Sequence, residues 1–258
     1  LSSHNQDILY LGSNFLHRSM EQGKTWEKIS PDLTNGKVEG NVAYGTITCV
    51  SESKFQFGLL YVGTDDGKIH LSKDGGVSWQ LISANLPQGL WVSRVAASSH
   101  IKERVYATLN GYRNDDFTTY VYVSEDYGVT WKSISNDSNH PANVILEDKT
   151  NENLLFLGTD NNLFVSIDRG SSWQDFSNGM PNVAVHDLVI QAKANELIVG
   201  THGRSIYKVS IAKLQELTPK IAEKSLHLFK LEAKEKSKMW GDKYSSWEKT
   251  IEPKLTIW

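Results

Sequence analysis

Residues 72–79 read SKDGGVSW, and the pattern that they contain, Ser-x-Asp-x-Gly-x-x-Trp, decides the fold of this 258-residue chain. The pattern returns without a mismatch at 124–131 and 166–173, and with Glu21 in the place of Asp at 19–26. Successive copies stand about 40 to 50 residues apart, the length of one repeat unit in several repeat proteins. The sequence therefore predicts one supersecondary unit that is used several times.

Each side chain of the repeated motif suits a tight hairpin. The Ser hydroxyl and the Asp carboxylate can bond the backbone of the turn, the Gly allows a positive φ, and the Trp fills the gap between strands. A catalytic role for the Asp residues is disfavoured, because one such residue per unit places them far apart around a rim. We expect a structural role for the residues of the exact copies: Ser72, Asp74, Gly76, Trp79, Ser124, Asp126, Gly128, Trp131, Ser166, Asp168, Gly170 and Trp173.

Four short segments rich in Val, Ile, Leu, Tyr and Thr surround each exact copy, and Gly, Asn or Asp bounds them, as is typical of strands. The expected strands of the three complete units are 45–52, 59–65, 68–72 and 78–83; 92–99, 104–109, 120–124 and 130–135; and 143–148, 154–159, 163–166 and 172–177. Partial units are expected at both ends, with strands at 8–12, 15–19, 183–191, 196–200 and 206–211. The chain is therefore predicted to be all-β, a β-propeller fragment of about three complete four-stranded antiparallel blades plus two partial ones.

Residues 1–211 are expected to form this partial propeller, and residues 212–258 a linker and the start of a truncated C-terminal domain. The segment 214–228 allows a short helix that begins near Pro219, and 247–258 could be a strand of the following domain. An open propeller leaves strand edges unpaired, so either the end blades close on each other or further blades lie upstream in the same parent chain. We favour upstream blades, and expect poor behaviour of the fragment alone.

Composition excludes several classes of protein. The net charge is −3, and no long Lys/Arg run interleaved with aromatic residues precedes the tail, so nucleic acid is not an expected partner. The sequence contains no run of about 18 apolar residues, the length that would predict a membrane-spanning helix. The lone Cys49 excludes an internal disulfide, and residues 1–7 lack the features of a signal peptide, although a signal could lie upstream.

The repeats resemble the Asp-boxes of bacterial BNR-repeat proteins related to the sortilin-type propeller. The resemblance runs from about Leu9 to Ile211, and the segment 225–229 is similar to the one that follows the propeller in that family. It is carried by the Asp-boxes and four further segments, namely 63–67 (GTDDG), 91–95 (WVSRV), 110–117 (NGYRNDDF) and 200–207 (GTHGRSIY).

This resemblance implies a region of a large exported protein, periplasmic, cell-surface or secreted. Such proteins are often labelled glycosyl hydrolases, because xyloglucanases and sialidases also carry Asp-boxes. Function must nevertheless be argued from a site, since a fold alone does not define one.

Propellers bind ligands at the mouth of the central channel, where the innermost strands and neighbouring loops converge. Polar candidates there come from the first strand of each blade and from the loop after its second strand. The ligand-binding candidates are Trp91, Arg94, Arg113, His186, His202 and Arg204, beside the acidic residues Asp65, Asp66, Asp115, Asp116, Asp160 and Asp187. The rings of Trp91, Tyr112 and Phe117 are expected in long loops of the third blade, where they could line a sugar groove.

Structural alternatives stand beside each candidate. Asp65-Asp66-Gly67 and Asn161-Asn162 are ordinary turn sequences, and the arginines could form ion pairs between blades. A metal held by His186, Asp187 and His202 has no supporting ligand spacing, so no metal is expected. No phosphate-binding loop or dinucleotide motif is present, so no cofactor is expected either.

The leading hypothesis is a non-catalytic propeller that binds a glycan or a peptide, or that serves as a scaffold. The rival is a glycoside hydrolase fragment, for which Asp115, Asp116 and Asp187 are the candidate carboxylates. A sortilin-like protein-interaction module is the third reading, and it differs from the first only in its ligand.

Overall fold

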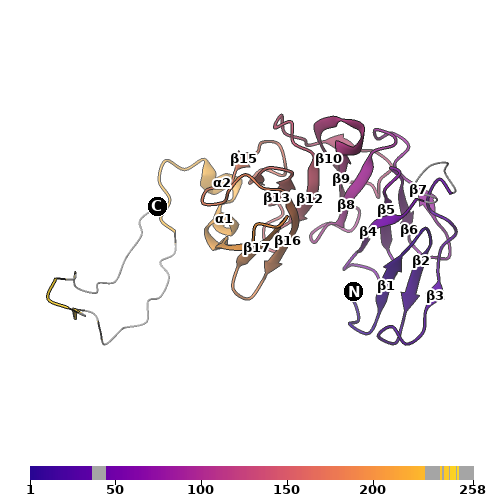
Figure 1. Ribbon diagram of the computed structural model, residues 1–258, viewed down its shortest axis with the longest axis horizontal. Helices are drawn as coiled ribbons and strands as arrows, with labels where there is room; N and C mark the ends of the chain where they lie inside the picture. The colour runs from indigo at the N-terminus through magenta and orange to yellow at the C-terminus, as the bar shows by residue number, and fades with distance from the viewer. Residues whose placement is uncertain (37–44, 230–238, 240, 244, 248, 250–258) are drawn as a thin grey trace. The chain divides into compact units, whose positions relative to one another are not determined.

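A computed structural model describes residues 1–36, 45–229, 239, 241–243, 245–247 and 249 of the chain. The chain divides into two compact units, Leu1–Glu223 and Lys224–Trp258. All strands and helices described below belong to the first unit (Figure 1).

The first unit consists of five antiparallel sheets that follow one another in chain order, which confirms the predicted all-β repeat fold. The first sheet holds β1 (Leu9–Gly12), β2 (Leu16–Ser19) and β3 (Glu27–Lys28). The second holds β4 (Ile47–Glu52), β5 (Leu60–Thr64), β6 (Ile69–Ser72) and β7 (Gln80–Leu81). The third holds β8 (Trp91–Ala97), β9 (Val105–Gly111), β10 (Asp116–Ser124) and β11 (Lys132–Ser133).

The fourth sheet holds β12 (Ala142–Glu147), β13 (Leu155–Thr159), β14 (Leu163–Ser166) and β15 (Gln174–Asp175). The fifth holds β16 (Val185–Gln191), β17 (Glu196–Thr201) and β18 (Ile206–Ser210). Two short helices follow, α1 (Ala212–Glu216) and α2 (Pro219–Ala222). The helical tail therefore begins earlier than the predicted start near Pro219, and it is broken into two pieces.

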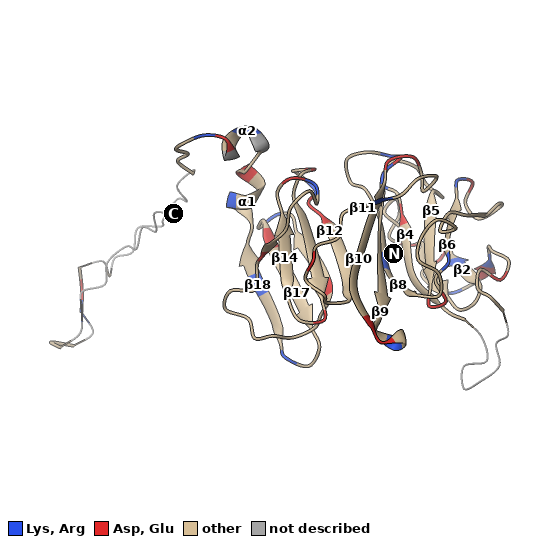
Figure 2. Cartoon of the chain, turned by 90° about the horizontal axis from the view of Figure 1, so that it is seen from above, with Lys and Arg blue, Asp and Glu red and all other residues tan. Residues whose placement is uncertain are grey.

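The innermost strands are β4, β8, β12 and β16, and each pairs with the following strand through a register shift near its beginning. Apolar side chains of adjacent sheets pack face to face, because both faces of an internal sheet are covered. Most charged side chains lie in the loops and turns that join the strands (Figure 2). The loops are thus free to carry function while the strands form the core.

Three details of the strand prediction were wrong. The fourth strands are only two residues long, because just the two residues that follow the Asp-box Trp pair with the third strand. Trp91 begins β8 and Phe117 lies in β10, so neither lies in a long loop. The segment 110–117 is a tight connection through a 3₁₀ turn, η1 (Tyr112–Asn114). The strand expected at 247–258 stays a prediction, because it falls almost wholly outside the described residues.

The Asp-box hairpins have the geometry that the motif predicts. Ser72 Oγ accepts from the Gly76 amide at 2.8 Å and donates to Asp74 Oδ1 at 2.9 Å. The Asp74 carboxylate also accepts from the amide and hydroxyl of Ser78, which holds the pKa of Asp74 down to about 2. The same bonds recur around Asp126 and Asp168.

Candidate functional site

The starts of the innermost strands and the loops after the second strands lie at the same end of the sheets, because neighbouring strands are antiparallel. We call this end the upper face; it comprises the starts of β4, β8, β12 and β16 and the loops 64–68, 111–116, 159–162 and 201–205. The lower face holds the loops after the first strands and the Asp-box turns. All the candidates from the sequence belong to the upper face.

An aromatic patch, which we define as Trp91, Tyr112, Arg113 and Phe117, lies on the upper face of the third sheet. The Tyr112 and Phe117 rings meet edge to face with centroids 6.0 Å apart, and they are 60% and 49% exposed. The Arg113 guanidinium lies over the Trp91 ring at 4.9 Å, and its Nη1 is 3.9 Å from Asp65 Oδ2. Trp91 Nε1 is buried and has no hydrogen-bond partner among the residues that the structure describes. The patch combines exposed apolar rings with one accessible cation.

Local backbone geometry positions the patch. Asn110 Oδ1 accepts from the Tyr112 amide at 2.9 Å, and Asn110 Nδ2 donates to Asn143 Oδ1 of the fourth sheet at 2.9 Å. Asp115 has a φ of 56°, which reverses the chain so that β10 can pair with β9. An ideal Cβ at Gly111 would lie 2.8 Å from Asp116 Cβ, so the connection fits only glycine closely.

The three candidate carboxylates take part in hydrogen bonds, an ion pair and a turn. Asp116 accepts hydrogen bonds from the Thr118 amide at 3.0 Å and from the Tyr120 hydroxyl at 2.9 Å. The hydrogen bond from the Thr118 amide is the main cause of its lowered pKa. Asp187 accepts from Arg94 at 2.7 Å. A general acid of a glycosidase needs a raised pKa, whereas the pKa of Asp116 is lowered. Asp115 takes part in the turn described above.

The arginine and histidine candidates divide between two arrangements. Arg94 on β8 reaches Asp187 on β16, so this ion pair links the inner strands of the third and fifth sheets past β12. The rings of His186 and His202 lie with centroids 5.2 Å apart, both exposed. Arg204 is exposed, and in the described part of the chain it forms no ion pair.

No group of three or more His, Cys, Asp or Glu residues is arranged to hold a metal ion among the residues that the structure describes. His186 and Asp187 lie on β16, and His202 directly follows its partner strand β17, but Asp187 is engaged by Arg94.

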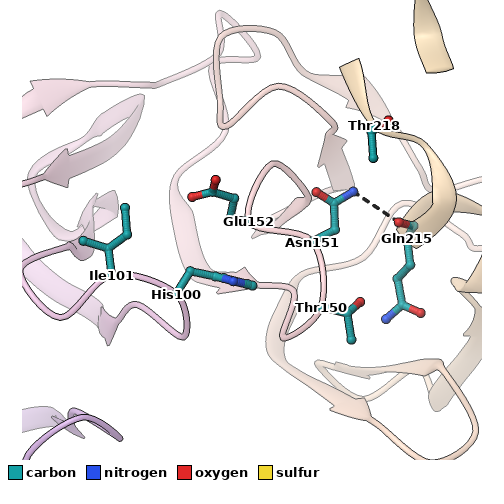
Figure 3. Close-up of a pocket in the computed structure, with 7 residues that line it drawn as sticks. All are labelled: His100, Ile101, Thr150, Asn151, Glu152, Gln215 and Thr218. Carbon is teal, nitrogen blue, oxygen red and sulfur yellow. Dashed lines mark hydrogen bonds between the residues drawn. The ribbon is translucent and has the colours of Figure 1, made fainter. Parts of the chain in front are cut away.

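A polar pocket of about 470 Å³ on the lower face escaped the reading of the sequence (Figure 3). Its lining residues fasten neighbouring loops to α1. His100 Nε2 donates to the Asp148 carbonyl at 2.7 Å, Gln215 Nε2 donates to Asp148 Oδ2 at 2.7 Å, and Asn151 Nδ2 donates to the Gln215 carbonyl at 3.3 Å. The hydrogen bonds around the pocket thus connect the loops of the propeller to α1. Its lining residues are His100, Ile101, Thr150, Asn151, Glu152, Gln215 and Thr218.

A repeated tripeptide was the missed signal for the lower face. Ser-Ser-His occurs at 2–4 and at 98–100, and both copies bind a glutamate of the next sheet. Glu52 accepts from Ser2 and Tyr10, and Glu147 accepts from Ser98 and Tyr106 at the same relative positions. The same set of hydrogen bonds, which we call the polar latch, therefore joins the first sheet to the second and the third sheet to the fourth.

One family model matches part of the sequence. Residues 119–245 match the family model Sortilin-Vps10, described as "Sortilin, neurotensin receptor 3". The resemblance to sortilin-type propellers is confirmed. A vacuolar protein sorting/targeting protein 10 from Colletotrichum graminicola (strain M1.001 / M2 / FGSC 10212) is 38% identical over 64 residues, which are 24% of this chain and 4% of that protein.

Structural comparison gives the fold at low identity. An ancestral GH74 enzyme matches with a TM-score of 0.63 and 16% identity, over 81% of this chain and 29% of its own. The GH74 xyloglucanase from Xanthomonas campestris matches with a TM-score of 0.61 and 20% identity, over 80% and 35%. YCF48 bound to D1 peptide matches with a TM-score of 0.56 and 12% identity, over 80% and 62%.

The chain thus spans about a third of the GH74 structures that it matches. The chain is thus a propeller-like region whose matched part is similar to the Sortilin-Vps10 family. Among the described residues, no helix is both long and apolar enough to cross a membrane.

Proposed function

We propose that residues 1–211 are the ligand-binding propeller region of a larger exported protein, and that the upper face binds a peptide segment without cleaving it. The single observation that carries the proposal is the aromatic patch. Trp, Tyr and Arg are the residues enriched where binding energy concentrates in protein interfaces. Here all three lie together on a loop face, with Tyr112 and Phe117 exposed.

The kind of ligand follows from the patch and from the family. Two edge-to-face rings can hold an apolar or aromatic side chain, and Arg113 can donate hydrogen bonds to a carboxylate or a backbone carbonyl. The matched family description names a receptor of neurotensin, and the fungal relative is named for protein sorting and targeting. Both names favour a peptide over a glycan.

The rival hydrolase reading is less well supported. The pKa of Asp116 is lowered, and the Asp187 carboxylate is neutralised by Arg94. Two carboxylates that flank one glycosidic bond, one of them held protonated, are the arrangement that this chemistry needs. The likeness to GH74 enzymes supports only the fold. A glycan therefore remains as an outcome of the experiment below.

Selection from a random peptide library displayed on phage tests this proposal, with a glycan array and a polysaccharide-hydrolysis assay beside it. We expect enrichment of peptides that contain an aromatic or large apolar residue. Enrichment should be lost when Tyr112→Ala and Phe117→Ala are combined. The matched control combines Phe55→Ala and Phe57→Ala, because these rings are 42% and 43% exposed on the lower face.

Peptide enrichment that persists in the Tyr112/Phe117 variant would contradict the site. Glycan binding without peptide binding would contradict the ligand class. Sugar release that is abolished by Asp116→Ala or Asp187→Ala would replace the proposal by the hydrolase reading.

A further inference from the structure

Two exposed histidines of the fifth sheet keep ring nitrogens that form no hydrogen bond in the described part of the chain. His186 lies on β16 and His202 directly follows β17. Their rings contact each other, with centroids 5.2 Å apart. By contrast, His4 and His100 each donate through Nε2 to a backbone carbonyl, at 2.9 and 2.7 Å. The two imidazoles of the fifth sheet are therefore free to bind something else.

Both side chains project from backbone that the sheet holds in place. His186 occupies the register shift near the beginning of β16. The His202 amide donates to the Ala184 carbonyl at 2.9 Å. Across the turn that follows, the Thr201 hydroxyl donates to the Ser205 carbonyl at 2.5 Å. A binding site needs side chains that rigid elements position, and this pair meets the condition.

The separation of the two rings is the one that a shared tetrahedral metal ion requires. A tetrahedral Zn²⁺ binds imidazole nitrogens at about 2.0 to 2.1 Å, which places the centroids of two bound rings about 5 Å apart. The observed separation is 5.2 Å, and the ring planes are inclined by 54°, so the rings are not stacked on each other. Rotation of an exposed ring about its Cβ–Cγ bond can turn either nitrogen toward the gap. One ion can therefore bind a nitrogen of each ring without movement of the backbone.

The type of ligand atom selects the class of ion. Imidazole nitrogens suit Zn²⁺, Cu²⁺ and Ni²⁺, whereas Mg²⁺ and Ca²⁺ take oxygen ligands. Among the described residues, no third His, Cys, Asp or Glu completes a set of protein ligands with the two rings. Two protein ligands leave the other positions of the ion open to water or to an incoming group. The pair therefore suits an exchangeable ion rather than an enclosed structural one.

The charged neighbours of the pair act in opposite directions. The Asp187 side chain is 60% exposed and bonds Arg94 through Oδ1 at 2.7 Å, while its Oδ2 forms no hydrogen bond within the described residues. That oxygen can accept a hydrogen bond from a water bound to the ion, as outer-shell carboxylates of metal sites do. Arg204 is exposed in the loop after His202 and opposes a cation. We therefore expect a moderate affinity that depends on both imidazoles.

We propose that His186 and His202 form a binding site for a divalent transition-metal ion of the Zn²⁺ class. The site belongs to the fifth sheet and the aromatic patch to the third, so this inference does not rest on the proposed binding of a peptide. It revises the expectation, drawn from ligand spacing in the sequence, that the chain binds no metal. The pairing of β16 with β17 brings the two rings together, and the spacing alone does not show that contact.

Calorimetric titration of zinc chloride into the complete native protein, without peptide, tests the inference. We expect that combining His186→Gln with His202→Gln weakens zinc binding at least tenfold. The matched control combines His4→Gln with His100→Gln, because these imidazoles on the lower face already donate to backbone carbonyls. The control should leave the zinc affinity unchanged, and an excess of magnesium chloride should not displace the zinc.

Equal zinc affinities of the two double variants would overturn the inference, as would displacement of the zinc by magnesium. The melting temperature gives an independent readout, because an ion that binds only the folded state stabilises it. Without zinc, the His186/His202 variant should melt at the temperature of the unsubstituted protein, since both side chains are exposed. Zinc should raise the melting temperature of the unsubstituted and control proteins more than that of the His186/His202 variant. An equal rise in all three proteins would also overturn the inference.

Discussion

His70 is a partly buried base whose environment makes the stability of the protein depend on pH. Burial above all, and then Lys68, lowers its pKa from 6.5 to about 4. Below about pH 6.5 the unfolded chain binds a proton that the folded chain refuses until about pH 4, so stability falls through this window. The full loss is about 3 kcal/mol.

His70→Phe should remove much of this loss, because the equivalent strand position of the fourth sheet is Phe164 and the ring fits there. Urea midpoints at pH 7 and pH 5 measure the effect, with the exposed His202→Gln as the control. An unchanged difference between the two midpoints in His70→Phe would show that another group is responsible.

Glu147 is a buried carboxylate that stabilises the fold through an ion pair with Arg104. It is 5% exposed, accepts from Tyr106 at 2.8 Å and pairs with Arg104 at 3.5 Å, which is itself 1% exposed. Removing one partner of a buried ion pair costs about 3 to 5 kcal/mol. Glu147→Gln should therefore lower the free energy of unfolding by about 3 kcal/mol, and Glu125→Gln, at a side chain 54% exposed, by less than about 1 kcal/mol. Equal effects in chemical denaturation would contradict this.

At the scale of the strand and the hairpin, the Asp-box Trp joins one sheet to the sheet before it. Trp131 Nε1 donates to the Ile82 carbonyl at 2.8 Å, so Trp131→Phe loses one hydrogen bond and leaves a carbonyl unpaired. The expected loss is about 1 to 2 kcal/mol. Trp26→Phe in residues 1–258 should leave the free energy of unfolding almost unchanged. Equal losses for the two substitutions in calorimetry would show that the Asp-box Trp does not stabilise the contact between sheets.

Elements were predictable where a local pattern sets them. Strand alternation and the Asp-box spacing gave the sheets and their order, and the confirmed fold class rests on them. The fourth strands were predicted too long, because apolar residues such as Ile82 belong to the joint between sheets rather than to the ladder. The turn at Asp115 was missed, since its φ of 56° depends on the pairing of β9 with β10.

At the scale of the whole molecule, the end sheets have three described strands each and leave strand edges open. Unpaired edges favour association with other chains. Residues 1–258 alone should therefore show a concentration-dependent rise in mass by light scattering. A monomeric fragment with one cooperative melting transition would contradict that expectation.

The sequence could place the candidate site on one face but could not predict its pairings. The choice of face followed from strand order alone. The ion pair between Arg94 and Asp187 spans two sheets, and the latch between Ser98 and Glu147 joins residues far apart in the chain. Such contacts depend on how sheets stack, which no local pattern encodes.

Titration of a peptide selected on the unsubstituted protein into three proteins tests the central claim most directly. We predict that combining Tyr112→Ala with Phe117→Ala weakens binding at least tenfold, while combining Phe55→Ala with Phe57→Ala leaves the affinity unchanged. Equal affinities for all three proteins, measured by calorimetry, would show that the upper aromatic patch is not the binding site.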